Sequence, residues 1–307
     1  MKKMEVHLHT NSDCNLHCIH CYNYSGERNS DLSKEPSDEY IINSLIYICG
    51  NYDAEIHLEG GEIFLRPELL KKMDSLSDDI LKRITITTNG TILNRDKTVL
   101  HMLRRVAVLR VSVESANAAV HSRIRGYSLQ SVTDHAKEYQ INGVPVCIRI
   151  TLNKLNYDHF IHNNIIKLSE KGFKTFQVYE FQRVGRGIDN CSLLTLDNSL
   201  RDLIDELCST PMHGISLKMM FPKRRISEIL RSQQKLIQAD YKTEVLTPDE
   251  GISIHTDGNV YACAWENDPQ TALFNWYDDH NARRIINTQK ILHECEYCTA
   301  IKITSLS

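Results

Sequence analysis

Short apolar runs alternate with segments of helical length through the first 180 residues of the chain. The apolar runs are rich in β-branched residues and predict strands at Met4–His9, Ala54–Leu58, Arg83–Thr88, Val108–Val113, Val146–Leu152 and Thr175–Phe181. The intervening segments predict helices at Ser37–Cys49, Pro67–Ser77, Asp96–Arg104, Ser128–Asn142 and Tyr157–Lys171. Strands that alternate with helices form a parallel sheet, and right-handed crossovers curl it into an open or closed barrel. The pattern therefore predicts an α/β fold.

The alternation fades after Gly187. The pattern there predicts helices at Leu196–Cys208, Lys223–Gln238 and Ala282–His293. Two short apolar runs, Gly251–His255 and Asn259–Cys263, flank Asp257 and Gly258, a strong signal for a β-hairpin. We therefore expect two parts: a barrel at residues 1–190, and linker helices with a small extension at residues 191–307.

Composition narrows the class of protein. The chain of 307 residues has 36 Lys+Arg and 39 Asp+Glu, a net charge of −3, which argues against a generally basic nucleic-acid binder. No window approaches the ~20 consecutive apolar residues of a membrane span. The first nine residues contain no apolar run of signal-peptide length. We expect a cytoplasmic protein that binds neither nucleic acid nor membrane.

The chain contains 10 cysteines, which in a reducing compartment favour metal or redox chemistry over disulfides. Cys14, Cys18 and Cys21 form a C-x3-C-x2-C run directly after the first predicted strand. In barrels the loops at this end of the strands carry the chemistry. Three thiolates on one loop can hold a cubane iron–sulfur cluster and leave one iron open. Zinc, with His17 or His20 as a further ligand, is the competing interpretation.

The cysteine spacing resembles the hallmark of the radical S-adenosylmethionine (radical SAM) superfamily, and further motifs resemble that family in the same order. Leu58–Glu62 resembles the Gly-Gly-Glu motif after the second strand, and Thr87–Thr91 resembles the Thr-Asn-Gly after the third. Val111–Glu114 resembles the fourth-strand end, with its Ser and acidic residue. His121–Gly126 resembles the His…Arg-Gly segment that follows. Val184–Gly187 resembles a Gly-Arg-Ala motif, with Gly187 in place of Ala.

The resemblance covers residues 4–190 and implies a partial (β/α)6 barrel of the TIM type. It implies a [4Fe–4S] cluster on Cys14, Cys18 and Cys21, whose open iron chelates SAM through its amine and carboxylate. Electrons would come from a donor such as flavodoxin or ferredoxin. The implied SAM-binding residues are Tyr22, Gly60, Gly61, Glu62, Asn89, Ser112, Glu114 and Arg125. In this pattern Glu62 binds the methionine ammonium and Arg125 the methionine carboxylate.

A second group of cysteines lies near the C-terminal end. Ile254–Cys263 resembles the hairpin that opens the SPASM or twitch extensions of radical SAM enzymes, with Ala262 where those have Pro. Cys295 and Cys298 resemble the closing C-x2-C. The resemblance implies one auxiliary [4Fe–4S] cluster on Cys263, Cys295 and Cys298. Its fourth ligand stays open among Cys191, Cys208, an Asp, a His or no protein ligand, and zinc remains an alternative.

Radical SAM enzymes with such extensions mostly modify ribosomally made peptides. The resemblance therefore implies a peptide crosslink, thioether or epimerisation. The alternative is oxidation or epimerisation of a small molecule such as a sugar or aminocyclitol. Because only three residues precede the first predicted strand, we expect either that a separate protein recognises a leader segment or that the substrate is short. The basic stretch Lys223–Arg225 with Arg231 either contacts an acidic peptide or is a solvated helix face. A redox-sensing iron–sulfur module is the interpretation without catalysis, and SAM cleavage discriminates between the two.

Overall fold

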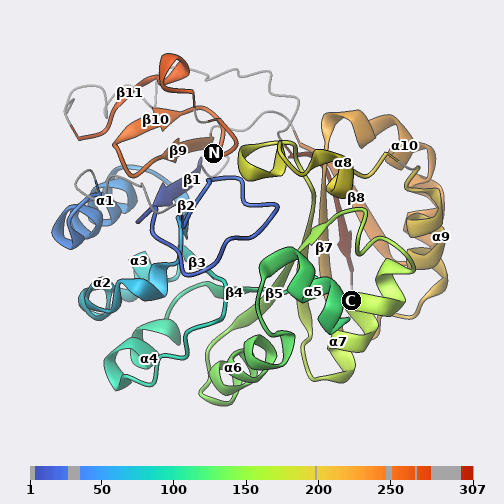
Figure 1. Ribbon diagram of the computed structural model, residues 1–307, viewed down its shortest axis with the longest axis horizontal. Helices are drawn as coiled ribbons and strands as arrows, with labels where there is room; N and C mark the ends of the chain where they lie inside the picture. Colours follow the sequence, from blue (N-terminus) through green and yellow to red (C-terminus); the bar gives the residue numbers. More distant parts are fainter. Residues whose placement is uncertain are drawn as a thin grey trace.

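One continuous open sheet forms the centre of the molecule. The computed structural model describes residues 4–26, 35–197, 199–246, 251–266, 268–277 and 299–306. The described strands form a 12-stranded sheet in the order β11-β10-β9-β1-β2-β3-β4-β5-β6-β7-β12-β8. Figure 1 shows the sheet curving around the loop that follows β1. The two edge strands, β11 and β8, do not pair with each other, so the barrel is not closed.

The six predicted strands are confirmed as the parallel centre of this sheet. They are β1 (Met4–His9), β2 (Ala54–Glu59), β3 (Ile84–Thr88), β4 (Val108–Ser112), β5 (Val146–Leu152) and β6 (Thr175–Glu180). Each pairs in parallel with the next along the chain. Their carboxyl ends therefore lie at one edge of the barrel, where the predicted motifs follow them.

The predicted helices of the barrel are also present, with shorter bounds. The helices between β1 and β6 are α1 (Asp38–Asn51), α2 (Pro67–Met73), α3 (Asp78–Leu81), α4 (Lys97–Leu103), α5 (Ala118–Arg125), α6 (Leu129–Ile141) and α7 (Lys167–Glu170). The N-terminus of α1 is capped by Ser37, whose side chain accepts a hydrogen bond from Tyr40 N. The segment predicted as Tyr157–Lys171 is a π-helical turn, η3 (Ile161–Ile166), that continues into α7.

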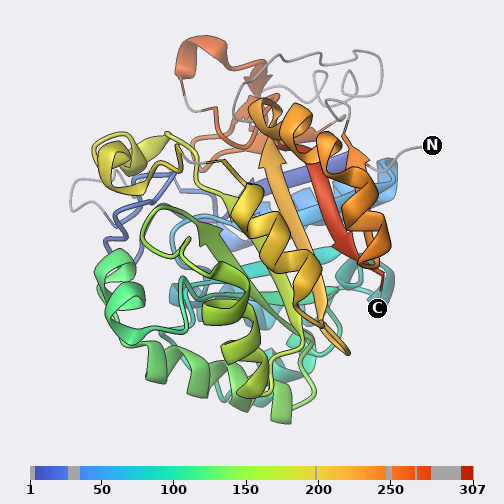
Figure 2. The same ribbon diagram turned by 90° about the vertical axis from the view of Figure 1, so that its right-hand side faces the viewer.

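The structure adds four strands that the sequence pattern did not predict, three of them beyond β6 and the fourth, β11, at the opposite edge. β7 (Ser216–Pro222) continues the parallel sheet beside β6. β12 (Thr299–Ser305) then pairs antiparallel with both β7 and β8 (Tyr241–Val245), as Figure 2 shows for β12 in red. The sheet thus runs through the boundary predicted at residue 190, and the division into two parts stays a prediction.

The remaining C-terminal elements lie along both edges of the sheet. The predicted hairpin is confirmed as β9 (Gly251–Ile254) and β10 (Asn259–Tyr261), with β9 parallel to β1 and β11 (Phe274–Asn275) beyond. The other helices are α8 (Cys191–Leu194), α9 (Arg201–Ser209), α10 (Ile226–Arg231) and α11 (Gln233–Gln238), with short 3-10 turns at η2 (Ile63–Leu65), η4 (Gly185–Gly187), η5 (Lys223–Arg225) and η6 (Pro269–Thr271). The predicted helix Lys223–Gln238 is thus three short pieces. The one predicted at Ala282–His293 lies outside the described residues.

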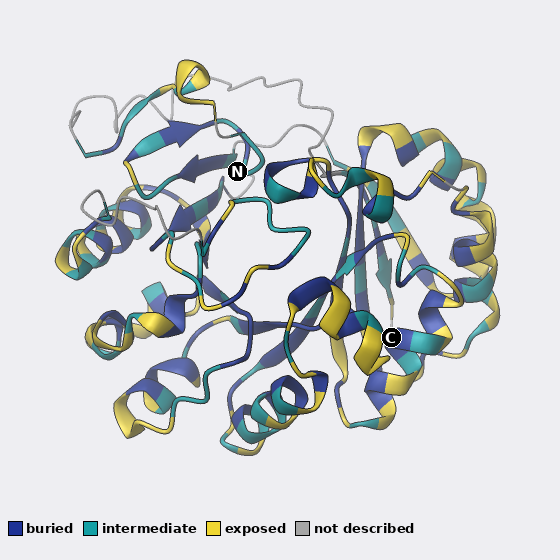
Figure 3. Cartoon of the chain, in the orientation of Figure 1, coloured by how far each residue is buried: buried dark blue, intermediate teal, exposed yellow. Residues whose placement is uncertain are grey.

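The two faces of the sheet differ in chemistry. Alternate residues of β1, such as Val6 and Leu8, are buried in a continuous apolar core with the surrounding helices. The residues between them, including His7 and His9, are polar and face the other way. Figure 3 shows buried positions gathered on the helix faces that cover the sheet and exposed positions on the outside. In the described part of the chain, no helix combines the length and the apolar character needed to cross a membrane.

Candidate active site

The loop that follows β1 lies across the carboxyl ends of the parallel strands and forms one wall of a pocket. Cys14, Cys18 and Cys21 all line this pocket, so the structure brings the three predicted cluster ligands together. Six predicted SAM-contacting residues line it as well: Tyr22, Gly60, Gly61, Asn89, Ser112 and Arg125. The other two, Glu62 and Glu114, are fully buried behind it. We call this space the cysteine pocket.

The Gly-Gly-Glu segment fixes the first half of the loop through backbone contacts. Gly61 N donates to Asn11 O at 2.6 Å, and Glu62 N donates to Asp13 O at 2.8 Å. A Cβ at Gly61 would lie 1.8 Å from Asp13 O, a distance no side chain tolerates. The glycine is therefore required because the loop backbone occupies the place of a side chain.

The segment after β6 fixes the second half of the loop. Arg186 N donates to Cys21 O at 2.8 Å. Its guanidinium donates to Cys18 O at 3.0 Å and to Ser25 O at 2.9 Å. A Cβ at Gly185 would lie 2.2 Å from Tyr22 O. The Gly-Arg motif thus clamps the cysteine loop, a role that the sequence resemblance had not given it.

Replacing Gly185 with alanine is expected to displace this loop. The added methyl group overlaps Tyr22 O, and overpacking of this kind costs roughly 1–3 kcal/mol. We expect a lower melting temperature and reduced iron content after anaerobic reconstitution. Gly50→Ala is the matched control, because a Cβ at Gly50 has no neighbour within 4 Å. Equal iron content in the two variants would contradict the clamp.

The environment of the thiols suits metal binding. Asn89 Nδ2 lies 3.8 Å from Cys14 Sγ, and Arg125 Nη1 lies 3.8 Å from Cys18 Sγ. Burial raises the pKa of the Cys18 thiol to about 11, even though Arg125 opposes the shift. A thiolate at neutral pH therefore requires a strongly positive partner, and iron supplies that charge. Three thiols on one loop in one pocket fit a cubane cluster with one open iron.

The histidines of the loop are less suited to complete a zinc site. His17 is exposed and does not line the cysteine pocket. His20 does line it, but its Nε2 lies 3.2 Å from Glu114 Oε1. A structural zinc requires four ligands, so the described loop favours the iron–sulfur interpretation over zinc.

Glu114 and Arg125 form a buried ion pair behind the pocket. Arg125 Nε donates to Glu114 Oε1 at 2.8 Å, and Nη2 lies 2.7 Å from the same oxygen. The other carboxylate oxygen accepts from Thr151 N at 2.9 Å. Burial alone would raise the pKa of Glu114, but His20 and Arg125 lower it below its usual range. Glu114 therefore holds Arg125 charged and oriented, and Arg125 Nη1 reaches the pocket.

Glu62 has a comparable supporting position. Its carboxylate accepts hydrogen bonds from Thr88 Oγ1 at 2.7 Å, from Asn89 N at 2.7 Å and from Phe64 N at 3.0 Å. Burial raises its pKa. All three hydrogen bonds come from the protein, and the role of Glu62 toward the methionine ammonium stays a prediction. The observed contacts fix the loop after β3, which places Asn89 in the pocket.

Several pocket residues were not predicted from the sequence: Arg149, Tyr179, Gln182 and Trp265. Glu59 accepts from Tyr22 Oη at 2.9 Å and lies 3.1 Å from His7 Nδ1 and 3.3 Å from Arg149 Nη1. Burial would raise the pKa of Glu59, but His7 and Arg149 hold it well below its usual range. The inner face of the barrel therefore carries fixed charges next to the pocket. For His7 and Glu59, the sequence signal is the period-two alternation of β1 and β2.

The C-terminal region contributes to the same pocket through Trp265. Its ring packs edge-on against Tyr22, with centroids 5.3 Å apart. Cys263 is buried, and Trp265 N lies 3.5 Å from its sulfur. The predicted auxiliary ligand Cys263 is thus two residues from the pocket lining. Cys295 and Cys298 lie outside the described residues.

Comparison with known proteins places these features in context. The model of the Radical SAM superfamily matches residues 9–162. A probable GTP 3′,8-cyclase of Sulfurisphaera tokodaii is 30% identical over 57% of this chain and 55% of its own length. The AdoMet-dependent heme synthase of Methanosarcina barkeri is 29% identical over 57% of this chain and 49% of its own length. The chain thus spans about half the length of these curated relatives.

Solved structures share the fold at lower identity. SuiB of Streptococcus suis, bound to S-adenosylmethionine, has a TM-score of 0.60 at 17% identity, covering 96% of this chain and 67% of SuiB. The anSMEcpe structure with bound AdoMet and Kp18Cys peptide has a TM-score of 0.65 at 18% identity, covering 92% of this chain and 80% of its own. These likenesses confirm the α/β architecture around an open parallel sheet.

Proposed function

Because the chain belongs to the radical SAM superfamily, we propose that its cysteine pocket holds a [4Fe–4S] cluster on Cys14, Cys18 and Cys21 and binds SAM beside it. The observation that carries this proposal is the convergence of the three thiols with Gly60, Gly61, Asn89 and Arg125 on one space. When bound and reduced, cluster and SAM supply a 5′-deoxyadenosyl radical that abstracts a hydrogen atom from the substrate. The protein positions the reactants and excludes water.

Different residues of the pocket have different proposed roles in binding SAM and the substrate. Arg125 offers a guanidinium suited to the methionine carboxylate of SAM, and Glu114 keeps that guanidinium in place. Asn89 is fixed by the hydrogen bond from its backbone N–H to Glu62 and lies next to Cys14. Thr87 Oγ1 is buried with no partner among the described residues and lines the same pocket. It offers a free hydroxyl to a bound ligand.

We propose a ribosomally made peptide as the substrate, which receives a crosslink, a thioether or an epimerised residue. Support comes from structural neighbours that were solved with peptides. SuiB bound to the precursor peptide SuiA has a TM-score of 0.56, and anSMEcpe with the Kp18Cys peptide has one of 0.65. Oxidation or epimerisation of a small molecule is the second candidate. It is favoured by the sequence relatives, which are named for GTP cyclisation and heme synthesis.

The C-terminal region is proposed to hold one auxiliary [4Fe–4S] cluster on Cys263, Cys295 and Cys298. Its support is the confirmed hairpin β9–β10, which precedes Cys263, and the position of Trp265 in the pocket lining. A cluster at Cys263 would lie near the reacting substrate and accept an electron from it. Flavodoxin or ferredoxin would reduce the catalytic cluster.

The substrate class can be tested on the reconstituted enzyme. Reduced protein and SAM are incubated anaerobically with peptides encoded by short open reading frames beside the gene, or with a panel of sugars and aminocyclitols. We expect one peptide to stimulate 5′-deoxyadenosine formation and to change in mass or, on epimerisation in D2O, to acquire one deuterium. Stimulation by a small molecule alone would overturn the peptide proposal. SAM cleavage without any substrate would still support the radical SAM assignment.

A further inference from the structure

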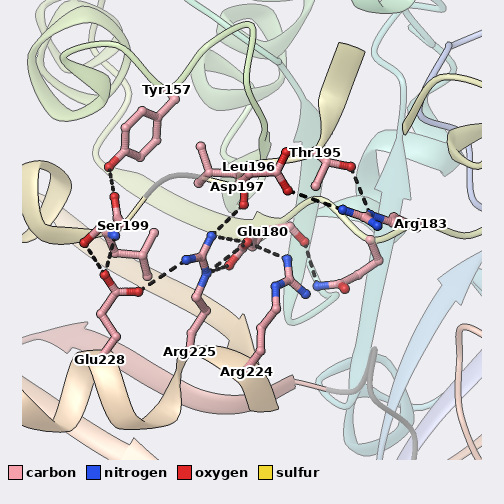
Figure 4. A network of polar contacts seen from close by, with 12 residues as sticks. Tyr157, Glu180, Arg183, Thr195, Leu196, Asp197, Ser199, Arg224, Arg225 and Glu228 are labelled. Atoms are coloured by element: carbon pink, nitrogen blue, oxygen red, sulfur yellow. Dashed lines mark hydrogen bonds and ion pairs between the residues drawn. The ribbon is translucent and has the colours of Figure 1, made fainter. Parts of the chain in front are cut away.

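A second hollow lies beside the cysteine pocket, where β6 and β7 end. Its lining includes Arg183, Lys223, Arg224 and Arg225, together with Gln182 and Asp197. We call it the basic hollow. Phe181 and Gln182 line both the basic hollow and the cysteine pocket, so the two spaces are neighbours. Figure 4 shows Arg224 and Arg225 of η5 beside Glu180, and Arg183, which follows β6, beside Thr195 and Asp197.

Two of these cations are anchored by the buried carboxylate of Glu180. Arg225 lies between Glu180 and Glu228 in Figure 4, with N–O distances of 2.9 Å and 3.2 Å. Arg224 Nη2 lies 2.6 Å from the same Glu180 carboxylate, whose side chain is fully buried. One glutamate is therefore shared by two arginines. The arrangement fixes both guanidinium groups and leaves the charge of Arg224 only partly neutralised.

The other two cations are more accessible. Arg183 lies 3.3 Å from Asp197, but both side chains are more than half exposed, and such pairs contribute little. Lys223 is exposed and has no ion pair within the described part of the chain. Four cationic side chains and one carboxylate line the hollow. When Glu180 is counted with the carboxylate of Asp197, the four cations still leave the basic hollow with a net positive charge.

A buried polar atom at the junction of the two spaces is a separate sign of a ligand. Gln182 is only 8% exposed, and its Nε2 donates to Glu180 O at 3.0 Å. Its Oε1 has no hydrogen-bond partner among the described residues. A buried acceptor without a partner destabilises the fold, so a native protein retains one where something satisfies it. A ligand that crosses from one space to the other would pass this oxygen.

We propose that the basic hollow binds an anionic group of the substrate, a carboxylate or a phosphate, while the reacting carbon lies in the cysteine pocket. This inference rests on the proposed radical SAM function and adds a requirement on the substrate. Guanidinium forks match the geometry of carboxylate and phosphate oxygens, and an ammonium adds a point charge. Gln182 Oε1 accepts a hydrogen bond from an N–H or O–H of the same substrate. The enzyme would thereby hold the substrate at two points.

The proposal predicts that anionic probes bind to the hollow. Calorimetric titrations of the reconstituted enzyme with SAM would use inorganic pyrophosphate, a tetraglutamate peptide and a tetraglutamine peptide. We expect at least one anionic probe to bind, the neutral peptide not to bind, and the affinity to fall with added salt. In Arg183→Gln/Lys223→Gln we expect the affinity to drop at least tenfold. Neither residue pairs with the buried Glu180, so this variant should fold, which its melting temperature would check.

Lys97→Gln is the matched control, since Lys97 is an exposed cation at the start of α4 and lies in neither pocket. Binding of tetraglutamate assigns the hollow to carboxylates of a peptide, and binding of pyrophosphate alone assigns it to a phosphate. Failure of both anions to bind, or equal binding by the double variant, would overturn the proposal. SAM cleavage without substrate should be unchanged in Lys97→Gln. If wild type fails to cleave SAM, the proposed function falls, but the binding result still stands.

Discussion

Replacing any one of Cys14, Cys18 and Cys21 with alanine is expected to reduce SAM cleavage to background. All three thiols line one pocket on one loop, and a cubane cluster with an open iron needs each of them. The loop is held at both ends, by Gly61 and by Arg186, so another side chain has little freedom to replace a lost ligand. The assay is 5′-deoxyadenosine formation by the reconstituted, reduced protein.

Iron content separates the two proposed clusters. Wild type should bind about eight irons, and the triple variant Cys14→Ala/Cys18→Ala/Cys21→Ala about four, if an auxiliary cluster is also present. A fall from about four irons to none would instead show a single cluster. Cys263 would then bind zinc or have a purely structural role. Cys49→Ala is the control, because Cys49 packs at the edge of the apolar core, away from the pocket. Normal SAM cleavage by any single loop variant would refute the assignment.

The fold was predictable from the sequence where strands are apolar on their buried face and bounded by clear turns. β7 was missed because Lys218 interrupts its apolar run and its methionines are not β-branched, although Leu217, Met219 and Phe221 are buried. β12 lies between β7 and β8 in the sheet, and it was recognised only from its pairing with both. Helix α5 was missed because its eight residues show only a weak apolar stripe.

The order of the site motifs along the chain was predictable, but which of their residues line the pocket and which support it from behind was not. Motif spacing identified the cysteine loop and the segments facing it. It could not distinguish Asn89, which lines the pocket, from Glu62, which is buried behind it and accepts a hydrogen bond from Asn89 N. Arg149 and Gln182 lie in no recognised motif of the sequence. Arg149 reaches Glu59 across 90 residues of sequence, and the position of Gln182 depends on the pairing of β6 with β7.

Replacing Glu114 with glutamine is expected to cause the largest loss of stability among single polar changes in the barrel. The change keeps the shape of the side chain but leaves the buried guanidinium of Arg125 without its counter-charge. Removing one partner of a buried ion pair costs about 3–5 kcal/mol. SAM affinity should fall as well, because Arg125 loses its orientation towards the pocket. Chemical denaturation and calorimetric SAM titration measure the two effects.

An exposed ion pair provides the control for this prediction. Glu138 pairs with Arg95, but their side chains are 36% and 72% exposed, so Glu138→Gln should change stability by about 1 kcal/mol or less. The pH dependence adds a second test. Because the folded protein lowers the pKa of Glu114 below its ordinary 4.5, this group stabilises the fold above that pH, and its contribution is lost as the pH falls. Glu114→Gln should therefore lose less stability than wild type on acidification. Equal costs for the two variants at neutral pH would show that Glu114 does not hold Arg125 in its charged position.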